Sequence, residues 1–210
     1  MRGDKDAILG KVASYYSSKL AEYGQSVRGV DWNGEESQMQ RFDQLSKVID
    51  RSKEFSVNDL GCGYGAYFEY LERNQDQIYY CGFDLSAEMV SAAQQRFGNN
   101  NRARFVVAGE PDVVADYGIA SGIFNVRLDS SDDAWLSHIL RTLDVLNRTS
   151  RCGFAFNCLT SYSDRDKMRE YLYYATPCEL FDYCKRTYSR DVALLHDYGL
   201  YEFTILVRKP

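Results

Sequence analysis

Glycines and carboxylates gather in one short stretch of the chain. An apolar run ends at Asp59, and three glycines follow at alternating positions, Gly61, Gly63 and Gly65. Glycine permits the positive φ of a tight turn and leaves the backbone bare for a ligand. A helix expected to begin at Ala66 adds unpaired N–H groups at the same place. The stretch therefore predicts a strand, a turn that binds a polar ligand, and a helix.

Two classes of ligand use such a turn, and the glycine spacing alone does not separate them. Gly61, Gly63 and Ala66 also fit the fingerprint of dinucleotide-binding domains. Asp59 favours a different ligand, because a buried carboxylate repels a pyrophosphate and attracts an ammonium group. Asp84 ends the next strand-like run, where a carboxylate can accept hydrogen bonds from both hydroxyls of a ribose. The carboxylates favour a positively charged aminoacyl nucleoside, and an NAD(P)-dependent oxidoreductase is the alternative.

The two stretches together resemble the first two motifs of class I S-adenosylmethionine (SAM)-dependent methyltransferases. The residues that carry the resemblance are DLGCGYG at 59–65 and GFDLSAEM at 82–89. It extends from about Phe42 to the C-terminus and implies an α/β fold with a doubly wound, Rossmann-like sheet. That sheet has seven strands in the order 3-2-1-4-5-7-6 with the last strand antiparallel. SAM is then the cofactor and S-adenosylhomocysteine the product.

The resemblance also implies where SAM is bound. The glycine turn and its flanking strand end hold the aminoacyl part, Leu85 and Met89 flank the adenine, and Glu110 receives the adenine amino group. Small residues within the fourth strand let the methionine pass close to the backbone, and the Arg41 guanidinium suits the methionine carboxylate. The predicted cofactor-binding residues are Asp59, Gly61, Cys62, Gly63, Gly65, Asp84, Leu85, Met89, Gly109, Glu110, Ser121, Gly122, Arg41 and Tyr16.

Hydrophobic spacing and turn residues place the remaining elements. Helices are expected over 6–23, 37–49, 66–73, 86–97, 131–146, 164–174 and 177–186. Strands are expected to end near 60, 85, 108, 124 and 159, followed by a hairpin of 191–198 and 201–208. Residues 1–53 form an N-terminal helical lid in this interpretation, and residues 54–210 form the methyltransferase domain.

Methyl transfer is an in-line displacement at carbon, so positioning supplies most of the catalysis. The predicted catalytic residues are Tyr16, whose ring can face the sulfonium, Asn125 at the end of the fourth strand, and His196 as a general base. His138 is expected to lie at the surface or in the packing of its helix rather than to act as a base. Because only short additions to the domain exist, the expected acceptor is an O or N atom of a small molecule. A catalytically silent module that binds SAM, or a partner chain through its C-terminal helices, is a further alternative.

Composition limits the kinds of partner and the cellular compartment that we expect. The chain has 210 residues and a net charge of −5, which argues against a nucleic-acid partner. It lacks an apolar run of 18 residues and a signal sequence, so we expect no membrane contact and a cytoplasmic location. Six cysteines without a C-x-x-C pair are expected to be free thiols rather than metal ligands. The oligomeric state is left open, a homodimer included.

Overall fold

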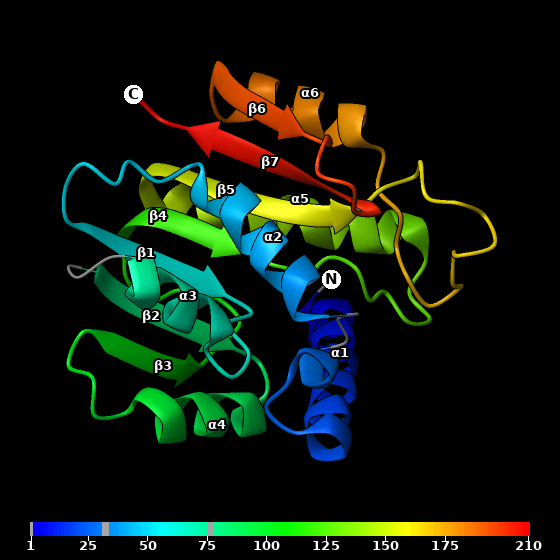
Figure 1. The fold of residues 1–210 in the computed structure, drawn as a ribbon. Helices are drawn as coiled ribbons and strands as arrows, with labels where there is room; N and C mark the ends of the chain where they lie inside the picture. The colour runs from blue at the N-terminus through cyan, green and yellow to red at the C-terminus, as the bar shows by residue number, and fades with distance from the viewer. Residues whose placement is uncertain (1, 31–33, 75–77) are drawn as a thin grey trace.

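The computed structural model describes residues 2–30, 34–74 and 78–210, which build a seven-stranded sheet in the order β3-β2-β1-β4-β5-β7-β6 (Figure 1). The neighbours from β3 to β5 pair in parallel, whereas β7 runs antiparallel to both β5 and β6. This confirms the predicted fold class, strand order and antiparallel last strand. The strands are β1 (Phe55–Leu60), β2 (Ile78–Asp84), β3 (Ala103–Val107), β4 (Ala115–Ala120), β5 (Ser150–Leu159), β6 (Asp191–Leu195) and β7 (Glu202–Arg208).

Helices cover both faces of this sheet. In Figure 1, α2 and α3 lie in front of the sheet, α5 lies behind it, and α1 stands across the ends of the strand arrows. The helices are α1 (Arg2–Tyr23), α2 (Glu35–Ser46), α3 (Ala66–Asn74), α4 (Ala87–Phe97), α5 (Asp132–Thr149) and α6 (Pro177–Thr187), with a 3-10 helix η1 (Val27–Val30).

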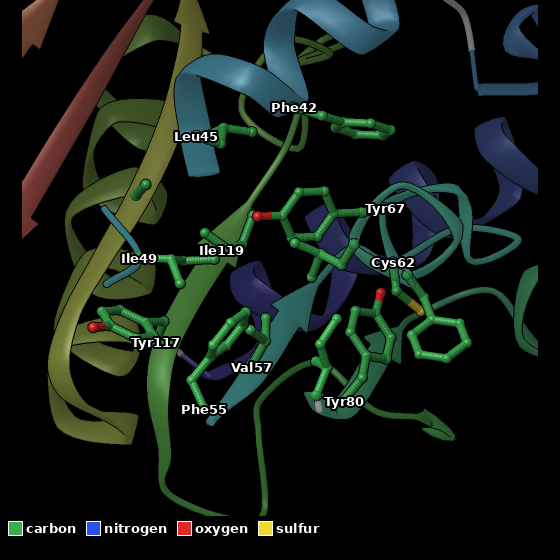
Figure 2. Packing of buried hydrophobic residues seen from close by; sticks show 14 of the residues in the cluster. Phe42, Leu45, Ile49, Phe55, Val57, Cys62, Tyr67, Tyr80, Tyr117 and Ile119 are labelled. Carbon is green, nitrogen blue, oxygen red and sulfur yellow. The ribbon is translucent and has the colours of Figure 1, made fainter. Parts of the chain in front are cut away.

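The core has two parts, one on each face, because parallel strands covered on both sides bury both sets of side chains. One part joins α2, α3 and α4 to the sheet through residues such as Phe42, Phe68 and Tyr80, and Figure 2 shows its side chains close up. The other part joins α5 and α6 to the sheet and contains Trp135 and Phe154. The front helix α2 is therefore part of the core, although the sequence assigns it to the lid segment.

Of the helices expected over 86–97 and 37–49, the first begins as predicted and the second begins earlier. Ser86 is the N-cap of α4, and its hydroxyl accepts a hydrogen bond of 3.1 Å from the N–H of Met89. The Ser37 hydroxyl instead donates to the carbonyl of Gly34, because α2 begins two residues before Ser37, at Glu35.

The segment 164–174 is the clearest error of secondary-structure prediction, since it forms turns instead of a helix. Its backbone groups bond to distant parts of the chain. The N–H of Tyr173 donates to the carbonyl of Asn125 at 2.8 Å, and an isolated bridge joins Val126 to Leu172. These long-range partners compete with the helical pattern that the local spacing suggests. Two strands also end earlier than predicted, β4 at Ala120 and β6 at Leu195.

Candidate active site

A cavity opens where the carboxyl ends of β1, β2 and β4 meet α1 and α5. Carboxyl ends of parallel strands are where ligands bind in open α/β sheets. The cavity brings together eleven of the residues predicted to bind the cofactor. These are Tyr16, Asp59, Gly61, Cys62, Gly63, Asp84, Leu85, Met89, Gly109, Ser121 and Gly122.

The glycine turn requires glycine for different reasons at its different positions. Gly61 has a φ of +79°, and a Cβ there would lie 2.1 Å from Cγ2 of Ile123. Its N–H donates to the carbonyl of Phe83 at 2.7 Å, which ties the turn to β2. Gly65 has a φ of +86°, and a Cβ there would press on the rings of Phe97 and Phe105. Gly61 thus lets the Ile123 side chain pack closely against the turn at the cavity, whereas Gly65 does not line the cavity and allows aromatic rings to pack.

Asp59 lies at the cavity floor with a single hydrogen bond. Its side chain accepts a hydrogen bond of 2.5 Å from the Tyr80 hydroxyl through Oδ2, while Oδ1 is buried with no hydrogen-bond partner among the residues that the structure describes. Burial raises the pKa of Asp59 to about 7; the Tyr80 hydrogen bond lowers this pKa and the charge of Asp84 raises it. A buried carboxylate oxygen facing a cavity fits a cationic ligand group.

Asp84 is held rigidly at the end of β2. Its Oδ2 accepts from the N–H of Gly63 and its Oδ1 accepts from the N–H of Ser86, both at 2.9 Å. Burial raises the pKa of Asp84, and these N–H groups lower it in part. Each carboxylate oxygen has a second lone pair, so the group can still accept hydrogen bonds from ligand hydroxyls.

The residues after β4 complete the floor opposite the glycine turn. Gly122 has a φ of +76°, and its N–H donates to Oδ1 of Asn157 at 2.7 Å. The Ser121 hydroxyl is buried, and it has no hydrogen-bond partner in the described part of the chain. Asp59 and Ser121 are thus two residues of the cavity lining that each have a buried polar atom without a partner among the described residues, and a bound ligand with polar groups could satisfy these atoms.

Besides Gly65, two predicted cofactor residues lie outside the cavity, Arg41 and Glu110. Nε of Arg41 donates to Oε2 of Glu202 at 2.7 Å, so the guanidinium pairs with a carboxylate of the protein instead of lining the cavity. Glu110 does not line the cavity, and its Oε2 lies 3.2 Å from the guanidinium of Arg148 on the surface.

Two predicted catalytic residues are also outside the cavity. Asn125 is buried, and its Oδ1 accepts from the N–H of Leu159 at 3.0 Å, so it fixes a loop. His196 follows β6, with its ring 5.8 Å from that of Tyr162 and 6.1 Å from that of Phe203. Because β6 is the edge strand of the sheet, this histidine lies away from the site.

The cavity includes residues that the sequence interpretation missed. Trp135, His138 and Thr142 line it from α5, and their spacing places them on one helical face. The helix itself was predicted, but which of its faces meets a cavity depends on tertiary packing. Leu9, Val12 and Ala13 line the cavity from α1, and Gln38 and Phe42 line it from α2.

Polar contacts hold α1 against the rim of the cavity at two points. The Lys11 ammonium lies 2.6 Å from a carboxylate oxygen of Asp129 in the loop after β4. The Ser17 hydroxyl donates to Glu88 at 2.8 Å and lies 2.9 Å from the hydroxyl of Ser86. These contacts are exposed or half-buried, so each contributes modestly to stability.

Comparison with solved structures gives the same fold. Human N-acetylserotonin methyltransferase in complex with SAM matches with a TM-score of 0.58 and 18% identity, over 95% of this chain and 56% of that chain. A SAM-dependent methyltransferase from Aquifex aeolicus matches with a TM-score of 0.58 and 18% identity, over 81% of this chain and 92% of that chain. The fold is therefore that of the Rossmann-like methyltransferases.

Sequence comparison establishes the family. A family model described as a methyltransferase domain matches residues 57–145. Rv1506c of Mycobacterium tuberculosis (strain ATCC 25618 / H37Rv) is 60% identical to this chain over 163 residues. Its name assigns it provisionally to the methyltransferases. The match covers 78% of this chain and 98% of that protein. The chain belongs to the SAM-dependent methyltransferases, enzymes whose cofactor is SAM. This membership decides against the NAD(P)-dependent oxidoreductase.

Two other kinds of feature are absent from the described residues. No helix within them is long and apolar enough to cross a lipid bilayer. They contain no group of three or more His, Cys, Asp or Glu side chains placed to hold a metal ion.

Proposed function

We propose that this enzyme transfers the methyl group of SAM to an O or N atom of a small, largely apolar molecule by in-line displacement. The observation that carries the proposal is Asp59, which lines the cavity beside Gly61 and whose buried Oδ1 has no hydrogen-bond partner among the described residues. An ammonium group satisfies this oxygen, whereas a pyrophosphate would be repelled by it.

The lining residues suit the successive parts of SAM. Asp59 and Ser121 would bind the aminoacyl end, and Asp84 would accept the ribose hydroxyls. Leu85 and Met89 would enclose the adenine. SAM supplies the activated methyl group when bound, and the protein binds and orients the reactants. Holding reactants in line contributes on the order of 7 to 11 kcal/mol.

Apolar side chains beyond these residues favour an apolar acceptor. Leu9, Val12 and Trp135 line the same cavity, which has far more apolar than polar surface. Of the two histidines in the chain, His138 lines the cavity, so it replaces His196 as the candidate base for an oxygen acceptor. Tyr16 also lines the cavity and remains a candidate to face the sulfonium. In this proposal α1 acts as a lid that shields the reactants from water.

Calorimetric titration with S-adenosylhomocysteine tests the cofactor part of the proposal. We expect the wild-type protein to bind it and Asp59→Asn to bind it more weakly. Asp116→Asn is the matched control, because this carboxylate lies on β4 outside the cavity and accepts from Ser56. Equal binding by wild type and Asp59→Asn, or tight binding of NADH, would refute the assignment of the cavity.

Methylation of an acceptor panel tests the catalytic part. The panel should contain small phenols, aromatic acids and amines, with S-adenosylhomocysteine release as the readout. Turnover with apolar phenols or amines supports the proposal. Binding of the product without turnover across the panel would instead favour a module that binds SAM and does not catalyse.

A further inference from the structure

A line of buried hydrogen bonds runs from α2 to the cavity floor. Nε of Arg41 donates to Oε2 of Glu202 at 2.7 Å, and Nδ2 of Asn157 donates to the same oxygen at 2.6 Å. Oδ1 of Asn157 then accepts from the N–H of Gly122 at 2.7 Å. Arg41, Glu202 and Asn157 are 8%, 3% and 0% exposed. The line thus crosses β7 and β5 and ends at a peptide bond of the cavity.

Only one arrangement of hydrogen-bond donors and acceptors is possible along this line. The carboxylate of Glu202 only accepts hydrogen bonds, so the amide of Asn157 must turn its NH2 group toward Glu202. Its oxygen then faces Gly122, whose N–H can only donate. Arg41 compensates the buried charge of Glu202, which would otherwise be costly. The three side chains therefore fix one orientation of the Asn157 amide.

This orientation sets the direction of the peptide between Ser121 and Gly122. The described residues contain no cis peptide bond, so the carbonyl of Ser121 points opposite to the N–H of Gly122, away from Asn157. β4 lies between β5, which carries Asn157, and β1, which carries Asp59. Asp59 pairs with Ile119, two residues before Ser121. At the cavity floor, the Ser121 carbonyl thus points away from β5.

We propose that Asn157, held by Glu202 and Arg41, is a positioning residue that orients the Ser121 carbonyl as a second acceptor for the ammonium of SAM, beside Asp59. The inference rests on the proposed cofactor site. Asn157 does not line the cavity and acts through the peptide alone. A peptide free to rotate would present its N–H to the ammonium in part of the population, and that arrangement is repulsive.

Calorimetry with two ligands separates this role from a structural one. S-adenosylhomocysteine carries the ammonium, whereas 5′-methylthioadenosine lacks the whole aminoacyl end and keeps the ribose and adenine. The variant is Asn157→Leu, which preserves side-chain volume and removes the acceptor for Gly122. The matched control is Asn58→Leu, because Asn58 is also a fully buried strand asparagine and donates to the carbonyls of Val113 and Thr149, outside the cavity.

We expect Asn157→Leu to weaken the binding of S-adenosylhomocysteine about tenfold, which is the loss typical of one hydrogen bond to a charged group. The affinity for 5′-methylthioadenosine should change less than about twofold. Asn58→Leu should leave the ratio of the two affinities unchanged. The inference is overturned if Asn157→Leu lowers the affinity for both ligands equally, or lowers the affinity for neither. If this variant does not fold, Asn157→Ala is measured in the same way, with Asn58→Ala as its control. Failure of the wild-type protein to bind either ligand refutes the proposed function itself.

Discussion

The raised pKa of Asp59 makes cofactor affinity depend on pH near neutrality. Burial raises the pKa of Asp59 to about 7 in the structure without ligand. An ammonium group binds the ionised carboxylate and is not attracted by the neutral acid. About one molecule in eleven carries the ionised form at pH 6 and about ten in eleven at pH 8. The affinity for S-adenosylhomocysteine should therefore rise about tenfold between pH 6 and pH 8.

Calorimetric titration at several pH values measures this effect. Repeating the titration at pH 6.5 in two buffers of different ionisation heat counts the protons released on binding. We expect about 0.8 of a proton to be released, because Asp59 is mostly protonated before binding and ionised after it. 5′-Methylthioadenosine is the control ligand, since it keeps the ribose that faces Asp84 and lacks the ammonium. The reasoning is wrong if the affinity for S-adenosylhomocysteine stays constant between pH 6 and pH 8, or if Asp59→Asn shows the same pH dependence as the wild type.

The same pKa affects the stability of the protein without ligand. The pKa of Asp59 in the folded state lies above its ordinary value of 3.8. The folded state therefore binds the proton more tightly, and stability is lost as pH rises from about 4 to about 7. A difference of about 3 pKa units corresponds to about 4 kcal/mol. Asp59→Asn should not show this loss of stability. In urea unfolding we therefore expect the variant to be more stable than the wild type at pH 8, but not at pH 4.

Three further predictions follow from single contacts of the site. Gly61→Ala should abolish binding of S-adenosylhomocysteine in calorimetry while a folded circular-dichroism spectrum is retained, because the added Cβ would lie 2.1 Å from a neighbouring side-chain carbon. Arg41→Met should lower the free energy of unfolding by about 3 to 5 kcal/mol, because it leaves the buried carboxylate of Glu202 without its cationic partner; a loss below about 1 kcal/mol in urea unfolding would contradict this. His138→Gln should lower kcat for an oxygen acceptor about 100-fold or more without changing the affinity for S-adenosylhomocysteine, whereas His196→Gln should change neither.

The sequence alone was informative where the chemistry is local. A glycine turn after a strand depends on φ and on the absence of Cβ atoms, so it can be recognised from neighbouring residues. The carboxylates Asp59 and Asp84 stand at strand ends, and parallel strands bring such ends to one edge of a sheet. These signals located most of the cavity floor, and the resemblance that they carry to the methyltransferase motifs implied the fold and the strand order.

Tertiary structure decided every feature that depends on partners far apart in the chain. Arg41 and Glu202 are separated by 161 positions, and no local pattern shows that they meet. The turns of segment 164–174 arise in the same way, from backbone bonds to Asn125, Arg127 and Leu128 in the loop after β4. His138 belongs to a helix that was predicted, but only packing shows that it faces the cavity. Side-chain periodicity describes one element at a time, whereas a buried polar group takes whichever partner the folded chain brings within hydrogen-bonding distance.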